Sequence, residues 1–309
     1  MKFPQLEQYL SYYSDSKNIV AVVCESEYIT KIDELSKKNN TSLLIFTFDQ
    51  INDIPKINIS AIIIVPKNLS TGLRIHEELQ DWKNREIPVL FGDKRDVFMG
   101  TPSWGLGGSG LTYAGMFKLV SSYLAGRQDI PENAVYAEFG VFDGRTFTLA
   151  YHCFKGFCSQ FLAYDSFCGI QGADLNEEST FKDGDYFSNI ETFKTNLRVS
   201  NVDLNRVSIV KKNFLELEVD LDESQNIVIV HIDCDVSKAA FAALSYVENR
   251  LGKGGIILFD DYDEMFADNT RGERAAFKKW QELNKHIEIT EYRTYAATGR
   301  CFLFYRKEN

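Results

Sequence analysis

The sequence lacks the features that would place it in several common classes of protein. Its 309 residues carry a formal net charge of -10 and no run of lysine or arginine, which argues against a nucleic-acid-binding protein. No apolar stretch reaches the roughly 20 residues that a membrane-spanning helix requires. Residues 1–18 are polar, so we expect neither a secretory signal peptide nor a membrane partner.

Cysteine and histidine are too sparsely arranged to suggest a zinc site or a redox centre. The six cysteines form no CxxC pair, and the four histidines show no HExxH motif. Several cysteines lie in apolar segments, where a free thiol behaves as a small hydrophobic side chain. We therefore expect reduced cysteines and a cytoplasmic protein.

Two familiar nucleotide-binding signatures are also missing from the places where they would function. Residues 96–112 include GLGGSG, but no Lys-Ser/Thr pair follows it and no predicted strand precedes it, so it is neither a P-loop nor a dinucleotide fingerprint. No Tyr-xxx-Lys pair follows a predicted strand either. These absences argue against the alternative of a nicotinamide-dependent oxidoreductase or nucleotide-sugar enzyme. Residues 96–112 are instead typical of a glycine-rich linker.

The apolar pattern of residues 1–95 predicts a small N-terminal α/β domain. Four short apolar segments, KNIVAVVC, TSLLIFTF, SAIIIVP and IPVLF, are typical of buried strands. The polar segments between them are typical of surface helices. Because this domain shows neither a phosphate loop nor an acidic cluster, we expect it to shape the substrate site or to join copies in a homo-oligomer such as a dimer.

Residues 113–309 predict a second, larger α/β domain. A predicted strand leads into Glu138, Gly140 and Gly144, and a helix follows. The glycines allow a tight turn and close packing of the helix on the strand. About twenty residues later Asp165 ends the next strand, where an acid can accept hydrogen bonds from both ribose hydroxyls. Glu138 suits a ligand with a positive group, or else it is a cap or a buried ion-pair partner.

Four further acids follow two apolar runs that are typical of buried parallel strands. Asp233 and Asp235 follow the first run, and Asp260 and Asp261 follow the second; a helix and a turn at residues 252–255 are expected between them. The carboxyl ends of parallel strands meet at one edge, so these carboxylates should face one crevice and repel each other unless a cation or proton intervenes. Oxygen ligands suit Mg²⁺ or another hard divalent cation. The alternative is that Asp235 caps the helix and the Asp pair lies in a solvated turn.

The remaining segments add a loop, a polar side chain and a hairpin to this domain. Residues 168–192 form a long polar loop that is either a lid over the ligand edge or a solvated surface loop. Asn213 follows the next predicted strand and could meet an adenine edge. Two strands joined by AATGR predict an antiparallel hairpin at the end of the chain.

Together these features resemble class I S-adenosylmethionine-dependent methyltransferases. The segments AYDSFCGI, HIDCD and LGKGGIILFDDYD are similar to the macrocin O-methyltransferase (TylF-like) family, over about residues 113 to 305. The resemblance implies a Rossmann-like α/β sheet, mostly parallel with an antiparallel C-terminal hairpin, beside the small N-terminal α/β domain. It also implies transfer of a methyl group to hydroxyls of sugars, mostly on antibiotics and related glycosides.

The resemblance further implies roles for individual residues. The family's metal ligands fall on Asp233, Asp260 and Asp261, and its general base falls on Asp235. The candidate cofactor-binding residues are Glu138, Gly140, Gly144, Asp165, Ser166, Asn213 and Asp233. The family usually reads D-G-D-x-Y-x-S-T where this chain reads DCDVSKAA, a departure that bears on the acceptor.

We therefore predict a metal-dependent O-methyltransferase that uses S-adenosylmethionine and Mg²⁺ on a sugar or another small hydroxylated acceptor. A cation bound by adjacent acceptor oxygens would lower the pKa of the hydroxyl, and Asp235 would take its proton. His231 shares a strand face with Asp233 and is a second candidate base, unless it is a core histidine. The remaining alternative is a non-catalytic module that binds S-adenosylmethionine.

Overall fold

The computed structural model describes residues 3–15, 17–56, 58–92, 111–173, 181–218 and 226–307. Most of the predicted linker at residues 96–112 therefore lies outside the described residues. The chain divides into two compact units, Met1–Val97 with Ser188–Asn201, and Phe98–Phe187 with Val202–Asn309.

The first unit contains a four-stranded parallel sheet in the order β2-β1-β3-β4. Its strands are β1 (Ile19–Cys24), β2 (Ser42–Thr47), β3 (Ala61–Val65) and β4 (Val89–Phe91), and its helices are α1 (Pro4–Tyr12), η1 (Ser26–Tyr28), α2 (Ile29–Asn39), η2 (Phe48–Asp53), α3 (Leu69–Glu78), α4 (Gln80–Asn84) and α8 (Ile190–Val199). All five residues of β3 are buried, which explains its uninterrupted apolar sequence. The four predicted strands of this unit are confirmed.

Helix α8 belongs to the first unit although it follows β6 of the second unit in the chain. Asn196 accepts a 2.6 Å hydrogen bond from the hydroxyl of Tyr9, and this pair is buried. The hydroxyl of Thr192 accepts a 2.9 Å hydrogen bond from the backbone N–H of Val89. The chain therefore returns to its first unit after it has begun the second.

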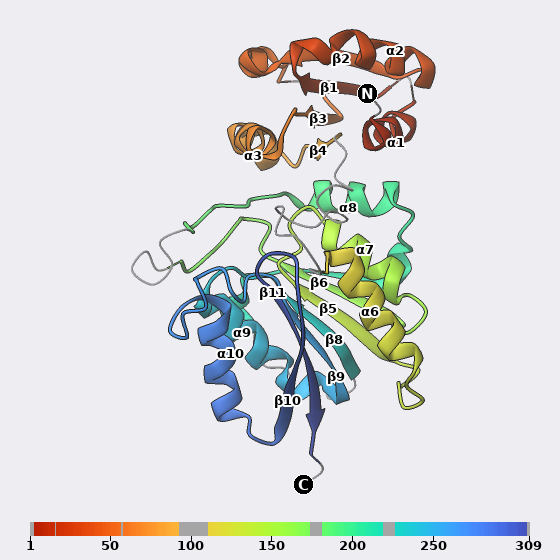
Figure 1. Cartoon of the computed structure of the whole chain (residues 1–309). Helices are drawn as coiled ribbons and strands as arrows, with labels where there is room; N and C mark the ends of the chain where they lie inside the picture. The colour runs from red at the N-terminus through yellow and green to blue at the C-terminus, as the bar shows by residue number, and fades with distance from the viewer. Residues whose placement is uncertain are drawn as a thin grey trace. The chain divides into compact units, whose positions relative to one another are not determined.

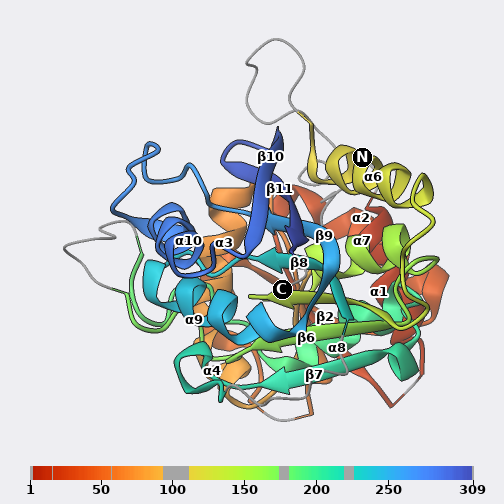
Figure 2. The ribbon, with the colours of Figure 1, turned by 90° about the horizontal axis from the view of Figure 1, so that it is seen from below.

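The second unit is built on a seven-stranded sheet in the order β10-β11-β9-β8-β5-β6-β7. Its strands are β5 (Ala134–Phe139), β6 (Gln160–Asp165), β7 (Val207–Lys211), β8 (Asn226–Ile232), β9 (Leu251–Phe259), β10 (Ile287–Tyr295) and β11 (Gly299–Arg306), and its helices are α6 (Tyr113–Ala125), α7 (Arg145–Phe154), η4 (Leu204–Arg206), η5 (Phe214–Glu216), α9 (Ser237–Val247), η6 (Glu248–Arg250) and α10 (Gly272–Leu283). Only the pairs that include β11 are antiparallel. The predicted Rossmann-like methyltransferase sheet with its C-terminal hairpin is confirmed, and its labelled strands β10, β11, β9, β8, β6 and β7 can be followed in this order from below (Figure 2).

Helices α6 and α7 cover one face of this sheet, and α9 and α10 cover the other (Figure 1). Successive residues of a strand point to opposite faces, so each strand contributes to both cores. Ala137 and Phe139 of β5 belong to the core that contains residues of α9 and α10. Tyr136 points to the other face, where its ring lies 5.9 Å from that of Phe147 in α7. The same alternation decides below which acids share a site.

The glycine-rich segment at residues 252–255 is part of β9, and the prediction of a turn there is wrong. Gly254 and Gly255 pair with β11 as ordinary strand residues. A Cβ atom on Gly255 would lie 2.1 Å from the carbonyl oxygen of Val228. The glycine therefore reflects the close approach of a neighbouring strand, which composition alone does not distinguish from a turn.

Two further expectations concern cysteines and membrane helices. All six cysteines are free thiols. Within the described ranges, every helix is too short or too polar to cross a bilayer.

Candidate active site

The candidate site lies at the carboxyl ends of β5 and β8, which are neighbours in the sheet. The chain leaves β5 toward β6 on one side, whereas β8 lies on the other, so this is the switch point where open α/β sheets bind ligands. Gly140 has φ 91° here, and a Cβ atom on it would lie 1.7 Å from the carbonyl oxygen of Asp233. The predicted cofactor turn and the predicted metal loop therefore touch directly, and only glycine permits that contact.

Three carboxylates gather beside this contact. Asp233, Asp235 and Asp261 each offer one oxygen, and these oxygens all lie within 4.8 Å of one another. All three side chains are partly buried. Asp235 has a left-handed backbone with φ 59°, which turns the chain sharply between β8 and α9. Sequence reasoning predicted that these residues share one crevice, and the structure brings them together.

Burial and mutual repulsion both act on the carboxylates of the triad, and a hydrogen bond joins the side chains of Asp235 and Asp261. Burial, followed by repulsion from neighbouring carboxylates, raises the pKa of Asp233 and of Asp261 well above the usual range. Burial likewise raises the pKa of Asp235 to about 7. Carboxylates in this state bind a proton or a cation. Three carboxylate oxygens at this spacing fit a hard divalent cation such as Mg²⁺.

Asp260 is not among these three grouped oxygens, although after burial its charge is the first cause of the raised pKa of Asp233. The Oδ1 atom of Asp260 is 4.0 Å from Nε2 of His231, and it is buried without a hydrogen-bond partner among the described residues. Burial raises the pKa of Asp260, whereas His231 and a hydrogen bond with Tyr113 oppose the rise. Adjacent residues at a strand end alternate in direction, which explains why Asp260 and Asp261 diverge. The predicted metal set thus shares Asp233 and Asp261 with the triad.

Glu138 and His231 are fully buried between the sheet and α6 and α7. Glu138 accepts hydrogen bonds from Tyr136 and, at 2.5 Å, from Thr146. Nδ1 of His231 lies 3.7 Å from Oε2 of Glu138, and its Nε2 lies 3.4 Å from the hydroxyl of Tyr295. These surroundings are compatible with the alternatives in which Glu138 is a buried ion-pair partner and His231 is a core histidine. A role in cofactor binding or catalysis stays a prediction for both.

Asp165 ties together the two loops that border the predicted cofactor site. Its Oδ2 accepts hydrogen bonds from the N–H groups of Val141 and Phe142 at 2.9 and 3.0 Å, and its Oδ1 accepts one from Phe167 at 2.6 Å. Gly144, with φ 85°, begins α7 just after the first of these loops. The carboxylate thus organises the backbone at the place where a ribose was predicted.

The other two predicted cofactor residues make local backbone contacts. The hydroxyl of Ser166 donates to the carbonyl of Gly169 at 3.1 Å, and it accepts from the N–H of Cys168 at 3.0 Å. The side chain of Asn213 caps η5 by accepting from the N–H of Leu215 at 3.0 Å. Both remain predictions as ligand contacts.

Sequence reasoning missed Glu273 in the first turn of α10. This carboxylate is fully buried and accepts 3.0 Å hydrogen bonds from the N–H groups of Cys234 and Asp261. Both donors belong to the loops that carry the triad. The one available signal was an acid at the start of a helix that follows two strand-end aspartates, and such acids are common because they favour helix N-termini.

The predicted lid is described only in part, because residues 174–180 lie outside the described ranges. Tyr186 is 49% exposed and has a left-handed backbone with φ 54°. Its ring centroid lies 6.3 Å from that of Phe142 in the turn after β5. Burial, followed by the charges of Asp235 and Asp261, raises its pKa to about 12. An aromatic side chain therefore lies within electrostatic range of the triad, whereas closure of the loop stays a prediction.

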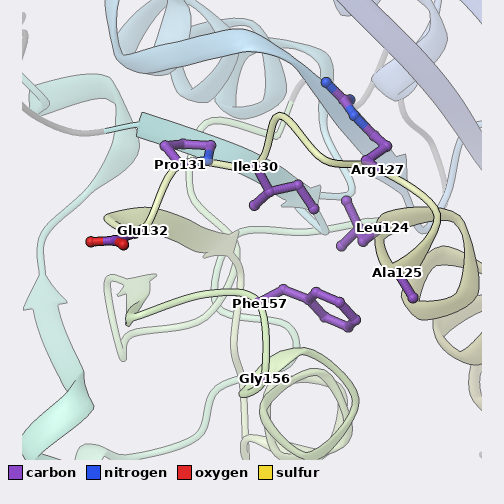
Figure 3. A pocket seen from close by; sticks show the side chains of 8 residues that line it. All are labelled: Leu124, Ala125, Arg127, Ile130, Pro131, Glu132, Gly156 and Phe157. Atoms are coloured by element: carbon purple, nitrogen blue, oxygen red, sulfur yellow. The ribbon is translucent and has the colours of Figure 1, made fainter.

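A separate pocket is lined by the ends of α6 and α7 and by the segment that leads into β5 (Figure 3). Its lining residues are Leu124, Ala125, Arg127, Ile130, Pro131, Glu132, Gly156 and Phe157. The guanidinium of Arg127 is already paired with Asp129, at 2.7 and 2.6 Å. This pocket contains no member of the candidate site.

Comparison with known families gives one match. The sequence profile of the family described as macrocin-O-methyltransferase (TylF) matches residues 125–295, more than half of the 309-residue chain. No curated protein sequence matches the chain significantly. The matched residues include every predicted cofactor, metal and catalytic residue.

Solved structures of O-methyltransferases are similar only at a low level. The O-methyltransferase NovP is 14% identical, with 63% of this chain and 79% of that chain covered and a TM-score of 0.49. CalS11, a TDP-rhamnose 3′-O-methyltransferase of calicheamicin biosynthesis, is 19% identical, with 63% and 80% covered and a TM-score of 0.42. TomG from Streptomyces achromogenes, in complex with S-adenosylmethionine, is 14% identical, with 62% and 80% covered and a TM-score of 0.42. Because these TM-scores are below 0.5, the assignment of the chain to a family rests on the sequence-profile match.

Proposed function

The chain belongs to the macrocin O-methyltransferase (TylF) family and is an S-adenosylmethionine-dependent O-methyltransferase, and from this we propose that its acidic edge binds a divalent cation that activates the acceptor hydroxyl. The observation that carries the proposal is the triad of Asp233, Asp235 and Asp261 beside the Gly140 turn. Family membership sets aside the nicotinamide-dependent oxidoreductase. An unoccupied triad would store repulsion, which also argues against a non-catalytic module.

We consider two arrangements of the cation site, and Asp233 and Asp261 are ligands in both. In the first arrangement Asp260 is the third ligand, as the family resemblance implies, and Asp235 is free to act as a base. In the second arrangement Asp235 is the third ligand, which the 4.8 Å grouping favours. Asp260 would then stay with His231 on the α6 side of the sheet. The two arrangements differ in what Asp235 does.

The proposed chemistry joins a proton transfer to a methyl transfer. When bound, S-adenosylmethionine supplies a methyl group on a positively charged sulfur, and Mg²⁺ supplies a Lewis acid that lowers the pKa of a coordinated hydroxyl. In the first arrangement Asp235 would take the hydroxyl proton as the methyl group passes from sulfur to oxygen. The carboxylates of Asp233 and Asp261 would hold the cation, and through it they would help to orient the acceptor oxygen. Asp165 keeps the Gly140 turn in place throughout.

The proposed acceptor is a small molecule with two adjacent hydroxyls, such as a sugar or glycoside. A cation held by Asp233 and Asp261 would orient the reacting oxygen best if a neighbouring acceptor oxygen also bound it, whereas a single hydroxyl would stay free to rotate. TDP-rhamnose, the substrate named for CalS11, is a suitable first probe. The exposed ring of Tyr186 would offer such a sugar an apolar face.

Titration and turnover with and without metal test this proposal. Isothermal titration should detect S-adenosylhomocysteine, and methyl transfer in a panel of sugars that includes TDP-rhamnose should vanish with EDTA and return with Mg²⁺ or Mn²⁺. Methyl transfer that EDTA leaves unchanged would remove the cation from the mechanism. Lack of binding to S-adenosylhomocysteine would contradict the predicted cofactor site itself.

A further inference from the structure

The carboxylate of Glu273 connects the two loops that carry the triad. Its Oε1 accepts a hydrogen bond from the N–H of Cys234, which lies between Asp233 and Asp235 in the chain. Its Oε2 accepts a hydrogen bond from the N–H of Asp261 itself, and both bonds measure 3.0 Å. One side chain thus bridges the loop after β8 and the loop after β9.

Burial of the Glu273 carboxylate costs free energy, and its two hydrogen bonds to the triad loops offset that cost. Glu273 is 0% exposed and lies among acids of the same charge, and a buried charge of this kind is expensive. An apolar side chain would leave two buried N–H groups without acceptors. A glutamine could accept one of these hydrogen bonds but would turn its NH₂ group toward the other donor. Only a carboxylate satisfies both loops at once.

The start of α10 is held against the triad by a second feature. Gly272, the first residue of the helix, has φ 58°, a conformation that side chains with a Cβ atom rarely adopt. A Cβ atom there would lie 3.2 Å from Cγ of Met265 and 3.9 Å from the carbonyl oxygen of Asp235. The backbone of α10 therefore begins directly beside Asp235, so Glu273 has little freedom to move.

We propose that Glu273 is a positioning residue that sets the separation between Asp233–Asp235 and Asp261 and thereby sets the affinity for the divalent cation. The inference rests on the proposed cation site and extends it to a group that does not touch the ion. Groups that orient metal ligands through hydrogen bonds typically contribute 10- to 100-fold to metal affinity. Glu273 acts through backbone N–H groups, so it fixes the loops rather than single side chains.

The test compares cation and cofactor affinities in the full-length protein. Mn²⁺ binding is followed by electron paramagnetic resonance and S-adenosylhomocysteine binding by calorimetry, in the wild type, Glu273→Gln and the control Glu282→Gln. Glu282 is exposed on the same helix, so the control makes the same chemical change away from the site. We expect Glu273→Gln to weaken Mn²⁺ binding about 10- to 100-fold, with S-adenosylhomocysteine affinity unchanged within about two-fold. Glu282→Gln should match the wild type in both.

The outcomes separate this inference from the proposed function. If the wild type does not bind Mn²⁺, the cation site fails and Glu273 has nothing to position. If the wild type binds Mn²⁺ and Glu273→Gln binds it equally well, the inference alone is overturned. A parallel loss of both affinities would mean a general structural role and would also overturn it.

Hydrogen exchange of the wild type supplies a measurement that does not depend on a folded variant. The N–H groups of Cys234 and Asp261 should be protected before any cation is added, because Glu273 already holds them. Exchange of these two amides at the rate of an unstructured chain would contradict the inference.

Discussion

Asp235 has a left-handed backbone conformation and is the proposed general base. Its φ of 59° lies in the left-handed region, which asparagine and aspartate tolerate better than other residues with a Cβ atom. Asp235→Asn should therefore keep the local backbone while removing the proton acceptor. We expect methyl transfer to fall about 10²- to 10⁴-fold, the usual contribution of general-base catalysis, and Mn²⁺ affinity to be preserved only if Asp260 is the third ligand.

The matched variant is Asp260→Asn, which removes a charge from the neighbouring strand end. Under the arrangement in which Asp260 is a ligand, this variant loses Mn²⁺ affinity and Asp235→Asn does not. The reverse pattern, measured by the same titration, would instead make Asp235 the third ligand and leave Asp260 as the partner of His231.

Gly140 is the residue at which a single methyl group should be most harmful. A Cβ atom would lie 1.7 Å from the backbone oxygen of Asp233, and φ is 91°. We expect Gly140→Ala to lower the free energy of unfolding by at least about 2 kcal/mol, since an unfavourable φ and a backbone clash add together. Thermal denaturation measures the loss. Gly156→Ala, where nothing lies within 4 Å of the added Cβ, should stay near the wild-type melting temperature.

Asp165 holds the backbone of the loop between β5 and α7 through hydrogen bonds. Its Oδ2 accepts from the N–H groups of Val141 and Phe142 and its Oδ1 accepts from that of Phe167, so Asp165→Asn leaves at least one donor without an acceptor, whichever way the amide is turned. We expect a loss of about 1–3 kcal/mol in unfolding free energy. Amide 167, or amides 141 and 142 if the asparagine amide is turned the other way, should exchange faster, and S-adenosylhomocysteine should bind more weakly. Unchanged exchange at all three amides would show that the carboxylate does not hold them.

Strand ends were predictable from the sequence because each apolar run stops at an acid or a glycine. The ends of β5, β6, β8 and β9 were all placed in this way, and the crevice of acids followed. Which three carboxylates have oxygens within 4.8 Å of one another was not predictable, because Asp260 and Asp261 are adjacent in sequence and differ only in the direction of their side chains. Glu273 was not predicted because it accepts hydrogen bonds from backbone N–H groups, and such bonds require no particular residue type in the sequence.

The assignment of α8 to the first unit was likewise hidden from the sequence. Its contacts use polar side chains that would suit an exposed helix, and only their burial identifies their role. Asn189, 3% exposed, caps α8 through the N–H of Thr192 and donates to the carbonyls of Lys83 and Ile87. Long-range hydrogen bonds of this kind have no local signature.

Asn189 therefore tests how far the first unit depends on this distant segment. Asn189→Ala removes a helix cap and two buried hydrogen bonds, and we expect a loss of about 2–3 kcal/mol in unfolding free energy. Asn68→Ala removes only the cap of α3, a 3.0 Å hydrogen bond from Thr71, and should cost about 1 kcal/mol. Chemical denaturation of both variants measures the difference. Equal losses would mean that α8 contributes little to the first unit.

At the scale of the whole molecule, the predicted homo-oligomer remains a prediction that light scattering would test. The division of the chain into two units also leaves the role of the first unit to experiment. Its sheet carries no cluster comparable with the triad among the described residues, since the one group of acids, cysteines or histidines close enough to hold a metal is that triad.

The return of the chain to its first unit has a consequence for synthesis on the ribosome. Residues Met1–Val97 cannot complete their packing until Ser188–Asn201 have been made, about a hundred residues later. At roughly 5–20 residues per second, this wait is on the order of 5–20 s. A nascent chain arrested before residue 188 should accordingly be cut by protease in its first 97 residues. Residues Met1–Val97 are thus made well before the segment that completes their packing.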